Sequence, residues 1–273
     1  MPLGLQVLIM GLPSTLGEQV RNRRMVFSLA MSDFRNRYAG SYFGFLWEIL
    51  QPLSLIFVFW FVFDFALHGQ APGGGPFLPW LIVGLIPWFL FSDAWTTATN
   101  AFVQYSFLVK KMVFRTELLP TVKVVSALIT SVIFHAIMVM ALVYYGDGGN
   151  LSSLMTFYYL ACVLTLALGA SFLTSSIMVF FKDTKQILGI VLLFGLYLTP
   201  ILWSPDIVGP DVRWMLDLNP MNYVVEGYRN SLIFGTVDID PVATGIFWAI
   251  TLIILFVGVM VYERLRPHFS DVL

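Results

Sequence analysis

The residues of this chain that could do chemistry are few and lie far apart. Asp93 and His135 are ionisable groups within apolar stretches, where a charge is costly and often functional. A proton relay between them would indicate a proton-coupled carrier, whereas a hydrogen bond between helices would account for Asp93 alone. Asp238 and Asp240 resemble the paired aspartates that hold a metal-bound sugar nucleotide, as in a glycosyl-transfer enzyme. A solvated turn before Pro241 is the simpler interpretation of that pair.

The common catalytic and nucleotide-binding motifs are absent from the sequence. It contains no G-x-x-x-x-G-K-[ST], H-E-x-x-H or G-x-S-x-G pattern. The histidines His68, His135 and His268 are widely separated, and Cys162 is the only cysteine, so neither a metal cluster nor an internal disulfide is expected. We therefore predict that the chain is not an enzyme and has no catalytic residues, no metal and no cofactor of its own.

The composition indicates that the bilayer is the solvent for most of this chain. Hydrophobic residues make up 58% of the 273 residues and charged residues 11%, against roughly 45–50% apolar residues in soluble domains. Six apolar stretches are long enough to cross a hydrocarbon core as helices. The sequence thus predicts an all-α integral membrane protein with a single domain over 1–273 and spans at 44–67, 78–97, 124–145, 157–181, 187–203 and 242–262.

The basic residues fix the expected orientation of these spans. With the N-terminus inside, thirteen of the fifteen Lys and Arg residues lie on the cytoplasmic side, and only Arg213 and Arg229 lie outside. Because short cytoplasmic loops are enriched in Lys and Arg, both termini are predicted to be cytoplasmic.

The segment 16–43 precedes the first span and has an amphipathic pattern. Phe27, Met31, Phe34 and Tyr38 repeat at helical spacing, with arginines and serines on the opposite face. Such a helix is expected to lie in the plane of the membrane interface.

Two connecting segments also carry structure. The run 108–120 is charged and partly apolar, and we expect a short helix that lies flat between spans two and three and ends at Pro120. The external segment 204–241 is long for a loop, and its apolar pieces 212–218 and 221–234 are too short to span. Because bare backbone cannot face lipid, we expect re-entrant helices there, between spans five and six.

Aromatic residues make up 16% of the chain and are dense in spans one and five. Most aromatic side chains in membrane proteins form interfacial belts or face lipid. Rings that continue through a span could instead line a tunnel, because sugars offer polarised C–H faces to a ring. The candidate channel-lining residues are Phe57, Trp60, Phe63, Phe194, Tyr197 and Trp203.

Several blocks of sequence resemble the permease subunits of polysaccharide-exporting ABC transporters, in the branch that exports O-antigen, teichoic acid or capsular polysaccharide. The run from Asp33 to Trp47, followed by Gln51-Pro52, is similar to the way these permeases enter their first span. One departure is that the family usually has a proline shortly after Lys110-Lys111. Further similar blocks, in the same order, are Gly84–Trp88, Leu108–Lys111, Leu119-Pro120, Leu198–Ile201, Leu218–Met221, Gly227–Arg229 and Arg266–Phe269.

The resemblance implies a homodimer of this permease in the bacterial cytoplasmic membrane, bound to two separate ATPase subunits that use ATP and Mg²⁺. Spans one and five of both protomers would form the channel, with lipid around them and no role for nucleic acid. The segment that couples to the ATPase is expected to include Leu108, Lys110, Lys111, Phe114, Arg115 and Glu117.

The expected substrate is a polysaccharide on a polyprenyl diphosphate, with O-antigen in first place. Arg35 and Arg37, with Tyr38 beside them, are candidate ligands for the pyrophosphate, because a guanidinium binds phosphate in a bidentate manner. The same arginines also satisfy the orientation rule without any such role. The alternative functions are a small-molecule or drug exporter of the same superfamily, a membrane-embedded glycosyl-transfer enzyme and a proton-coupled carrier.

Overall fold

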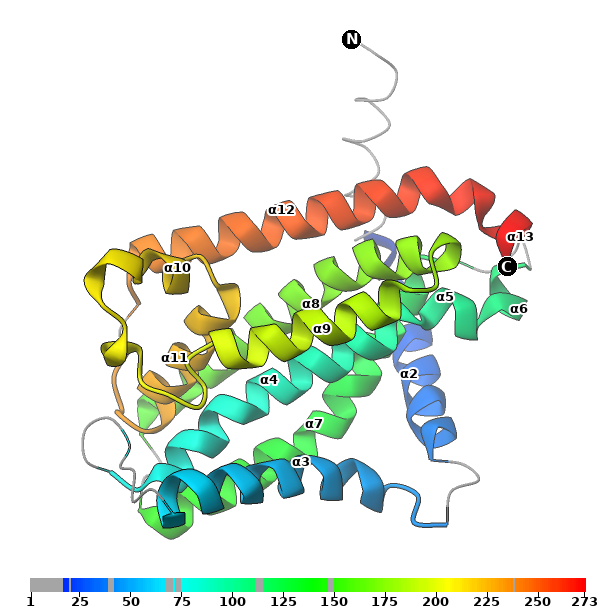
Figure 1. Ribbon diagram of the computed structural model, residues 1–273. Coiled ribbons are helices and arrows are strands. Elements are labelled where there is room, and N and C mark those ends of the chain that lie inside the picture. The colour runs from blue at the N-terminus through cyan, green and yellow to red at the C-terminus, as the bar shows by residue number, and fades with distance from the viewer. Residues whose placement is uncertain are drawn as a thin grey trace.

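The protein is described here by a computed structural model that covers residues 17–19, 21–38, 42–66, 71, 75–110, 115–146, 150–237 and 239–273. The regular structure of this part of the chain consists of helices, with no strand among the described residues (Figure 1). A π-helical turn at Phe61–Ala66 extends α3, and 3-10 turns lie at Leu151–Leu154, Pro205–Ile207, Pro210–Val212 and Arg266–His268. The α-helices are α2 (Arg23–Arg37), α3 (Leu46–Trp60), α4 (Phe77–Thr99), α5 (Ala101–Gln104), α6 (Ser106–Val109), α7 (Leu118–Tyr145), α8 (Met155–Phe180), α9 (Thr184–Leu198), α10 (Trp214–Asp217), α11 (Pro220–Leu232), α12 (Pro241–Leu265) and α13 (Phe269–Val272).

Five helical stretches in the described residues are long and apolar enough to cross a membrane, and they match five of the six expected spans. They are Leu46–Ala66, Phe77–Thr99, Leu118–Tyr145, Leu151–Phe180 and Pro241–Val272.

The expected fifth span, 187–203, differs from the structure at its end. Its helix is α9, which has 15 residues and therefore rises about 22 Å, less than the roughly 30 Å of a hydrocarbon core. The helix stops because Pro200 follows Thr199, and a residue before proline is disfavoured in the helical conformation. Thr199 accordingly has an extended backbone, with φ −81° and ψ 134°.

The third long helix begins earlier than predicted. α7 starts at Leu118, six residues before the expected start at 124, and Pro120 lies in its first turn. A proline is tolerated there because its missing N–H would have no partner within the helix. The expectation that Pro120 ends the preceding helix was therefore wrong. The short helices α5 and α6 come before the connection, and residues 111–114 lie outside the described part.

α4 is the centre of the bundle. It packs against α7, α8 and α11, and most of its side chains are buried, among them Trp80, Leu85 and Phe91. A helix that is apolar on all sides is expected in the interior. α3 is also apolar but lies at the outside of the bundle, along one side of the other long helices (Figure 1). Ile56 is its only buried residue.

α8 and α12 approach each other closely through two glycines. A Cβ atom on Gly258 would lie 2.4 Å from the carbonyl oxygen of Gly169, and a Cβ atom on Gly169 would lie 2.9 Å from the backbone of Leu255. Small residues at a helix contact let backbones approach and gain dispersion energy, which is a main source of association between helices in lipid.

A Gly258→Ala variant is expected to be less stable by about 1–3 kcal/mol, because the added methyl group meets backbone that cannot move aside. Gly245→Ala on the same helix is the matched control, since a Cβ atom there meets nothing within 4 Å. Alanine favours helix over glycine by about 1 kcal/mol, so the control should be unchanged or slightly more stable. Thermal unfolding in one detergent measures both variants, and equal destabilisation of the two would contradict the close contact.

The two ends of the bundle carry different elements. α2, α5, α6 and α13 gather at one end, and α10 and α11 lie at the other (Figure 1). α2 runs across the direction of the long helices and packs on α7. Its buried face is formed by Val26, Ala30 and Asp33, which is offset by one residue from the expected face of Phe27, Met31, Phe34 and Tyr38. Phe27 is 57% exposed.

Candidate functional site

A cluster of charged side chains joins α2, α3 and α4. Arg37, the last residue of α2, donates hydrogen bonds to the carboxylate of Asp93 at 3.1 and 3.2 Å and to that of Glu48 at 3.3 Å. All three side chains are mostly buried. Burial alone would lower the pKa of Arg37, but Asp93 and Glu48 raise it above its ordinary value, so Arg37 stays charged. Two acidic side chains thus share one guanidinium.

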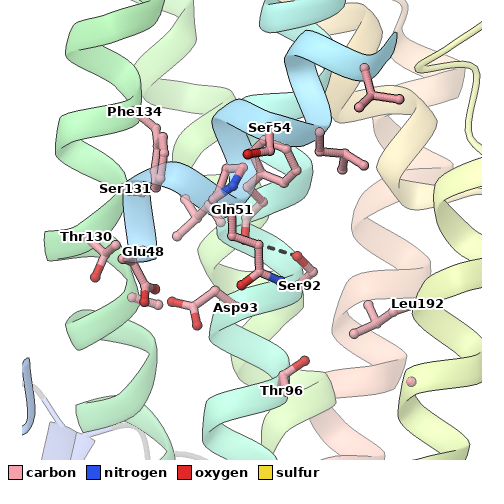
Figure 2. A pocket seen from close by; sticks show the side chains of 17 residues that line it. Glu48, Gln51, Ser54, Ser92, Asp93, Thr96, Thr130, Ser131, Phe134 and Leu192 are labelled. Atoms are coloured by element: carbon pink, nitrogen blue, oxygen red, sulfur yellow. Dashed lines mark hydrogen bonds between the residues drawn. The ribbon is translucent and has the colours of Figure 1, made fainter. Parts of the chain in front are cut away.

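A cavity of about 830 Å³ opens beside this cluster, between α3, α4, α7 and α9. Phe89, Phe134 and Leu192 form apolar parts of its wall. Glu48 and Gln51 point into it from α3, and Asp93 points into it from α4 (Figure 2). Its polar lining includes Glu48, Gln51, Ser92, Asp93, Thr96 and Thr130.

The chemistry of this lining fits binding. Carboxylates accept hydrogen bonds, while amides and hydroxyls both donate and accept. The lining has no cysteine, lysine or histidine, so it offers no thiol or amine nucleophile and no imidazole base. The size is within the roughly 300–1,000 Å³ that is typical of small-ligand sites.

Asp93 and His135 belong to separate networks. Asp93 binds Arg37, whereas His135 contacts the carbonyl oxygen of Ser131 through Nδ1 at 2.8 Å and the hydroxyl of Tyr228 through Nε2 at 3.1 Å. The described residues therefore provide no direct relay between the two groups. Asp240 has a structural role, since it accepts a hydrogen bond from the Val242 amide at the start of α12. Asp238 lies outside the described residues.

A second buried charge pair joins α2 to α7. Lys123 donates to Asp33 at 2.5 Å and to Gln104 at 2.8 Å, and Tyr105 donates to the same Asp33 oxygen at 2.6 Å. Both charged side chains are almost fully buried, at 4% and 3% exposure. Burial raises the pKa of the Asp33 carboxyl, but the hydrogen bonds from Lys123 and Tyr105 outweigh it, and the net pKa is lowered.

The three candidate pyrophosphate ligands are placed differently from one another. Arg35 is exposed on α2, whereas Arg37 is engaged by Asp93 and Glu48. Tyr38 is half-buried, and burial raises the pKa of its hydroxyl. A free guanidinium is therefore offered by Arg35, while Arg37 already has anionic partners.

The expected coupling segment is partly held by other segments at its end of the bundle. Leu108 is half-buried and Lys110 is exposed, while Lys111 and Phe114 lie outside the described residues. Arg115 forms an ion pair with Glu18. Glu117 is buried and pairs with Arg266 of the C-terminal segment at 3.2 Å.

The candidate channel aromatics lie on two helices with large exposed apolar faces. On α3 and its extension, Phe57 is 59% exposed, while Trp60 and Phe63 pack partly against the core. Trp60 also donates to Asp64 at 2.6 Å. On α9, Phe194 and Tyr197 are 61% and 53% exposed.

The last of these aromatics, Trp203, lies beyond the end of α9. Its indole N–H donates to the carbonyl of Tyr197 at 2.9 Å.

Arg229 is a buried residue whose position the sequence did not indicate. It was expected on the external side of the membrane, within the apolar piece 221–234, and its side chain is 1% exposed. It donates to the carbonyls of Pro200 at 2.7 Å and Ile201 at 3.0 Å, pairs with Glu226 and lies 3.5 Å from the ring centre of Trp80. It thus holds α11 against the end of α9.

The long apolar helices, with a partly polar cavity between them, define a multi-pass membrane protein. The profile of the ABC-2 type transporter family matches residues 24–233, which is most of the chain and runs from the first turn of α2 to the end of α11. The chain belongs to this family. It is a transporter permease rather than an enzyme, as the missing nucleotide-binding motif predicts, and its membrane location agrees with the apolar helices.

Three relatives are similar over nearly their whole length. The chain is 27% identical to the O-antigen export system permease protein RfbA of Klebsiella pneumoniae, over 88% of this chain and 92% of the relative. It is 26% identical to the Myxococcus xanthus protein of the same name, over 93% and 97%. It is 24% identical to the polysialic acid transport protein KpsM of Escherichia coli, over 87% and 92%.

Proposed function

We propose that this chain is the channel-forming subunit of an ATP-driven exporter that moves a lipid-linked polysaccharide, with O-antigen as its substrate, across the cytoplasmic membrane. The observation that carries the proposal is the similarity to two O-antigen export permeases over 88% and 93% of the chain. KpsM, named for a different polysaccharide, supports the polymer class over small molecules.

In the proposed assembly, two copies of the chain bind two ATPase subunits. The exposed apolar faces of α3, with its π-helical extension, and of α9 support this arrangement. Side chains such as Phe57, Phe65 and Phe194 are exposed in the single chain, and a second copy or lipid would bury them. α9 is proposed as the fifth of six spans, and α10 with α11 as a re-entrant pair. Both termini are proposed to be cytoplasmic.

Loss of the gene tests the substrate. The expected result is that lipid-linked polysaccharide accumulates on the cytoplasmic side and disappears from the cell surface, and that the wild-type gene restores it. Surface labelling and extraction of the lipid-linked pool measure the two populations. Unchanged surface polysaccharide, together with ATPase stimulation by amphipathic drugs, would favour a small-molecule exporter.

Coupling to the ATPase is proposed to run through Lys110 and its neighbours. Lys110→Glu is expected to lower polysaccharide-dependent ATP hydrolysis at least severalfold, because an exposed charge is reversed at a contact with the partner. Lys182→Glu is the control, since it makes the same change at an exposed position between α8 and α9. The assay uses the reconstituted complex, and equal activities of the two variants would exclude the role of Lys110.

A further inference from the structure

The cavity beside α3 concentrates polar groups within apolar helices. Glu48 and Gln51 lie in the stretch Leu46–Ala66, and Asp93 and Thr96 lie in Phe77–Thr99, both of which are apolar enough to span a membrane. Polar and ionisable groups at such positions are expensive and usually line a pathway or a binding site. The cavity is therefore a candidate for a polar ligand.

The charges in the cavity limit the chemistry of that ligand. The lining holds two acidic side chains, Glu48 and Asp93, and no basic one, and the nearby guanidinium of Arg37 is already paired with both. A phosphate or carboxylate entering the cavity would find no cation in the lining and would meet carboxyl oxygens at low dielectric, where electrostatic interactions are stronger than in water. An uncharged ligand has no such penalty.

The hydrogen-bonding groups of the cavity suit hydroxyls. The carboxylates of Glu48 and Asp93 only accept, and each interacts with Arg37, which leaves further acceptor positions. The amide of Gln51 and the hydroxyl of Thr96 also line the cavity, and each can donate and accept. A ligand with several hydroxyl groups could donate hydrogen bonds to the carboxyl groups of Glu48 and Asp93. It could both donate to and accept from the side chains of Gln51 and Thr96.

The apolar wall complements this polar side. Phe89 and Phe134 line the cavity, and their ring centres lie 6.3 Å apart. A sugar ring has hydroxyls at its rim and C–H groups on its faces, so it matches a site with polar groups on one side and aromatic rings on the other.

We propose that this cavity binds an uncharged, polyhydroxylated sugar unit of the exported polymer, through Glu48, Gln51, Asp93 and Thr96. The inference rests on the proposed function and adds a sugar subsite to it. It also assigns the sugar and the pyrophosphate of the substrate to different places, because a lining with two acidic side chains and no basic one disfavours the pyrophosphate in this cavity.

The test uses the full-length chain in nanodiscs and two soluble probes, maltotetraose as the neutral one and a sialic acid tetramer as the anionic one. Saturation-transfer NMR with competition measures relative affinities. The wild-type chain is expected to bind maltotetraose and to discriminate against the anionic probe. Gln51→Leu and Thr96→Val should each weaken maltotetraose binding about five- to tenfold, since each removes one or two hydrogen bonds worth about 0.5–1.5 kcal/mol.

Thr165→Val is the matched control, because it removes a hydroxyl from α8 that lies outside the cavity and already donates to the Ala161 carbonyl. It should bind maltotetraose like the wild-type chain. No binding of the neutral probe, stronger binding of the anionic one, or equal affinities of Gln51→Leu, Thr96→Val and the wild-type chain would overturn the inference. Such results leave the proposed function intact if gene loss still traps polysaccharide inside the cell. Normal export after gene loss would instead refute the function itself.

Discussion

Replacing Lys123 with methionine is expected to lower the free energy of unfolding by about 3–5 kcal/mol, because Asp33 would keep its charge in a buried position without its counter-ion. Both side chains are almost fully buried, and the pair links α2 to α7. Tyr105 would still donate to Asp33, but a hydroxyl does not neutralise a carboxylate. The measurement is thermal or denaturant unfolding of the purified chain in detergent.

The double variant Asp33→Asn with Lys123→Met separates the charge effect from loss of packing. It removes both charges, and replacement of a buried pair by neutral groups is often close to neutral in stability. Recovery of most of the lost stability is therefore expected. If the double variant is as unstable as Lys123→Met alone, unpaired charge is not the cause. Lys182→Met removes an exposed lysine and should have no measurable effect.

The same pair predicts a pH dependence. The pKa of Asp33 is lowered in the folded chain, so its contribution to stability is present above the unfolded pKa and is lost as the pH falls through the folded pKa. Asp33→Asn should lack this component. The difference in free energy of unfolding between the wild-type chain and Asp33→Asn is therefore expected to shrink as the pH falls below about 4, the pKa of an ordinary aspartate. Unfolding curves recorded at several pH values measure it.

Replacing Arg229 with methionine is the second change with a large expected effect, about 2–5 kcal/mol of stability. Pro200 and Ile201 are both buried, and their carbonyls would lose the hydrogen bonds from Arg229. An unsatisfied buried polar group costs about 1–3 kcal/mol. The stacking of the guanidinium on Trp80 would be lost as well.

Two further variants test this assignment. Arg229→Lys keeps the charge, but a single ammonium cannot reproduce the fork that reaches two carbonyls, so only partial recovery is expected. Arg213→Met removes the other arginine of the segment between α9 and α12, and Arg213 is exposed, so its stability should not change. Limited proteolysis of the segment 199–219 gives an independent measure, since release of α9 from α11 should expose it. If Arg229→Met resists proteolysis as well as the wild-type chain does, Arg229 does not hold α11 against the end of α9.

Much of the fold could be predicted because apolar length is a direct signal of a spanning helix. Five of the expected spans have counterparts whose ends differ by at most ten residues. The exceptions follow from proline. Pro200 ends α9 earlier than hydropathy suggests, whereas Pro120 starts α7 instead of ending the preceding helix. Hydropathy does not show whether a proline ends a helix or lies in its first turn, because both prolines stand beside equally apolar residues.

The site was harder to predict, because its residues come together only through tertiary packing. Asp93 attracted attention as an intramembrane carboxylate, but nothing in the sequence paired it with Arg37, which lies 56 residues away. Lys123 and Arg229 were counted as ordinary basic residues of loops or helix ends, although both are buried. A charged residue within or beside an apolar helix signals that a partner exists, but the sequence alone does not identify it.

The early end of α9 has a consequence for the surrounding lipid. A helix of 15 residues presents an apolar surface of about 22 Å, while α12, with 25 residues, presents about 37 Å. Where α9 faces lipid, the neighbouring acyl chains must shorten or tilt, because a bilayer of full thickness would place them against the polar residues beyond the ends of the helix. The annulus of lipid around this protein is thus expected to be uneven in thickness, thinnest beside α9.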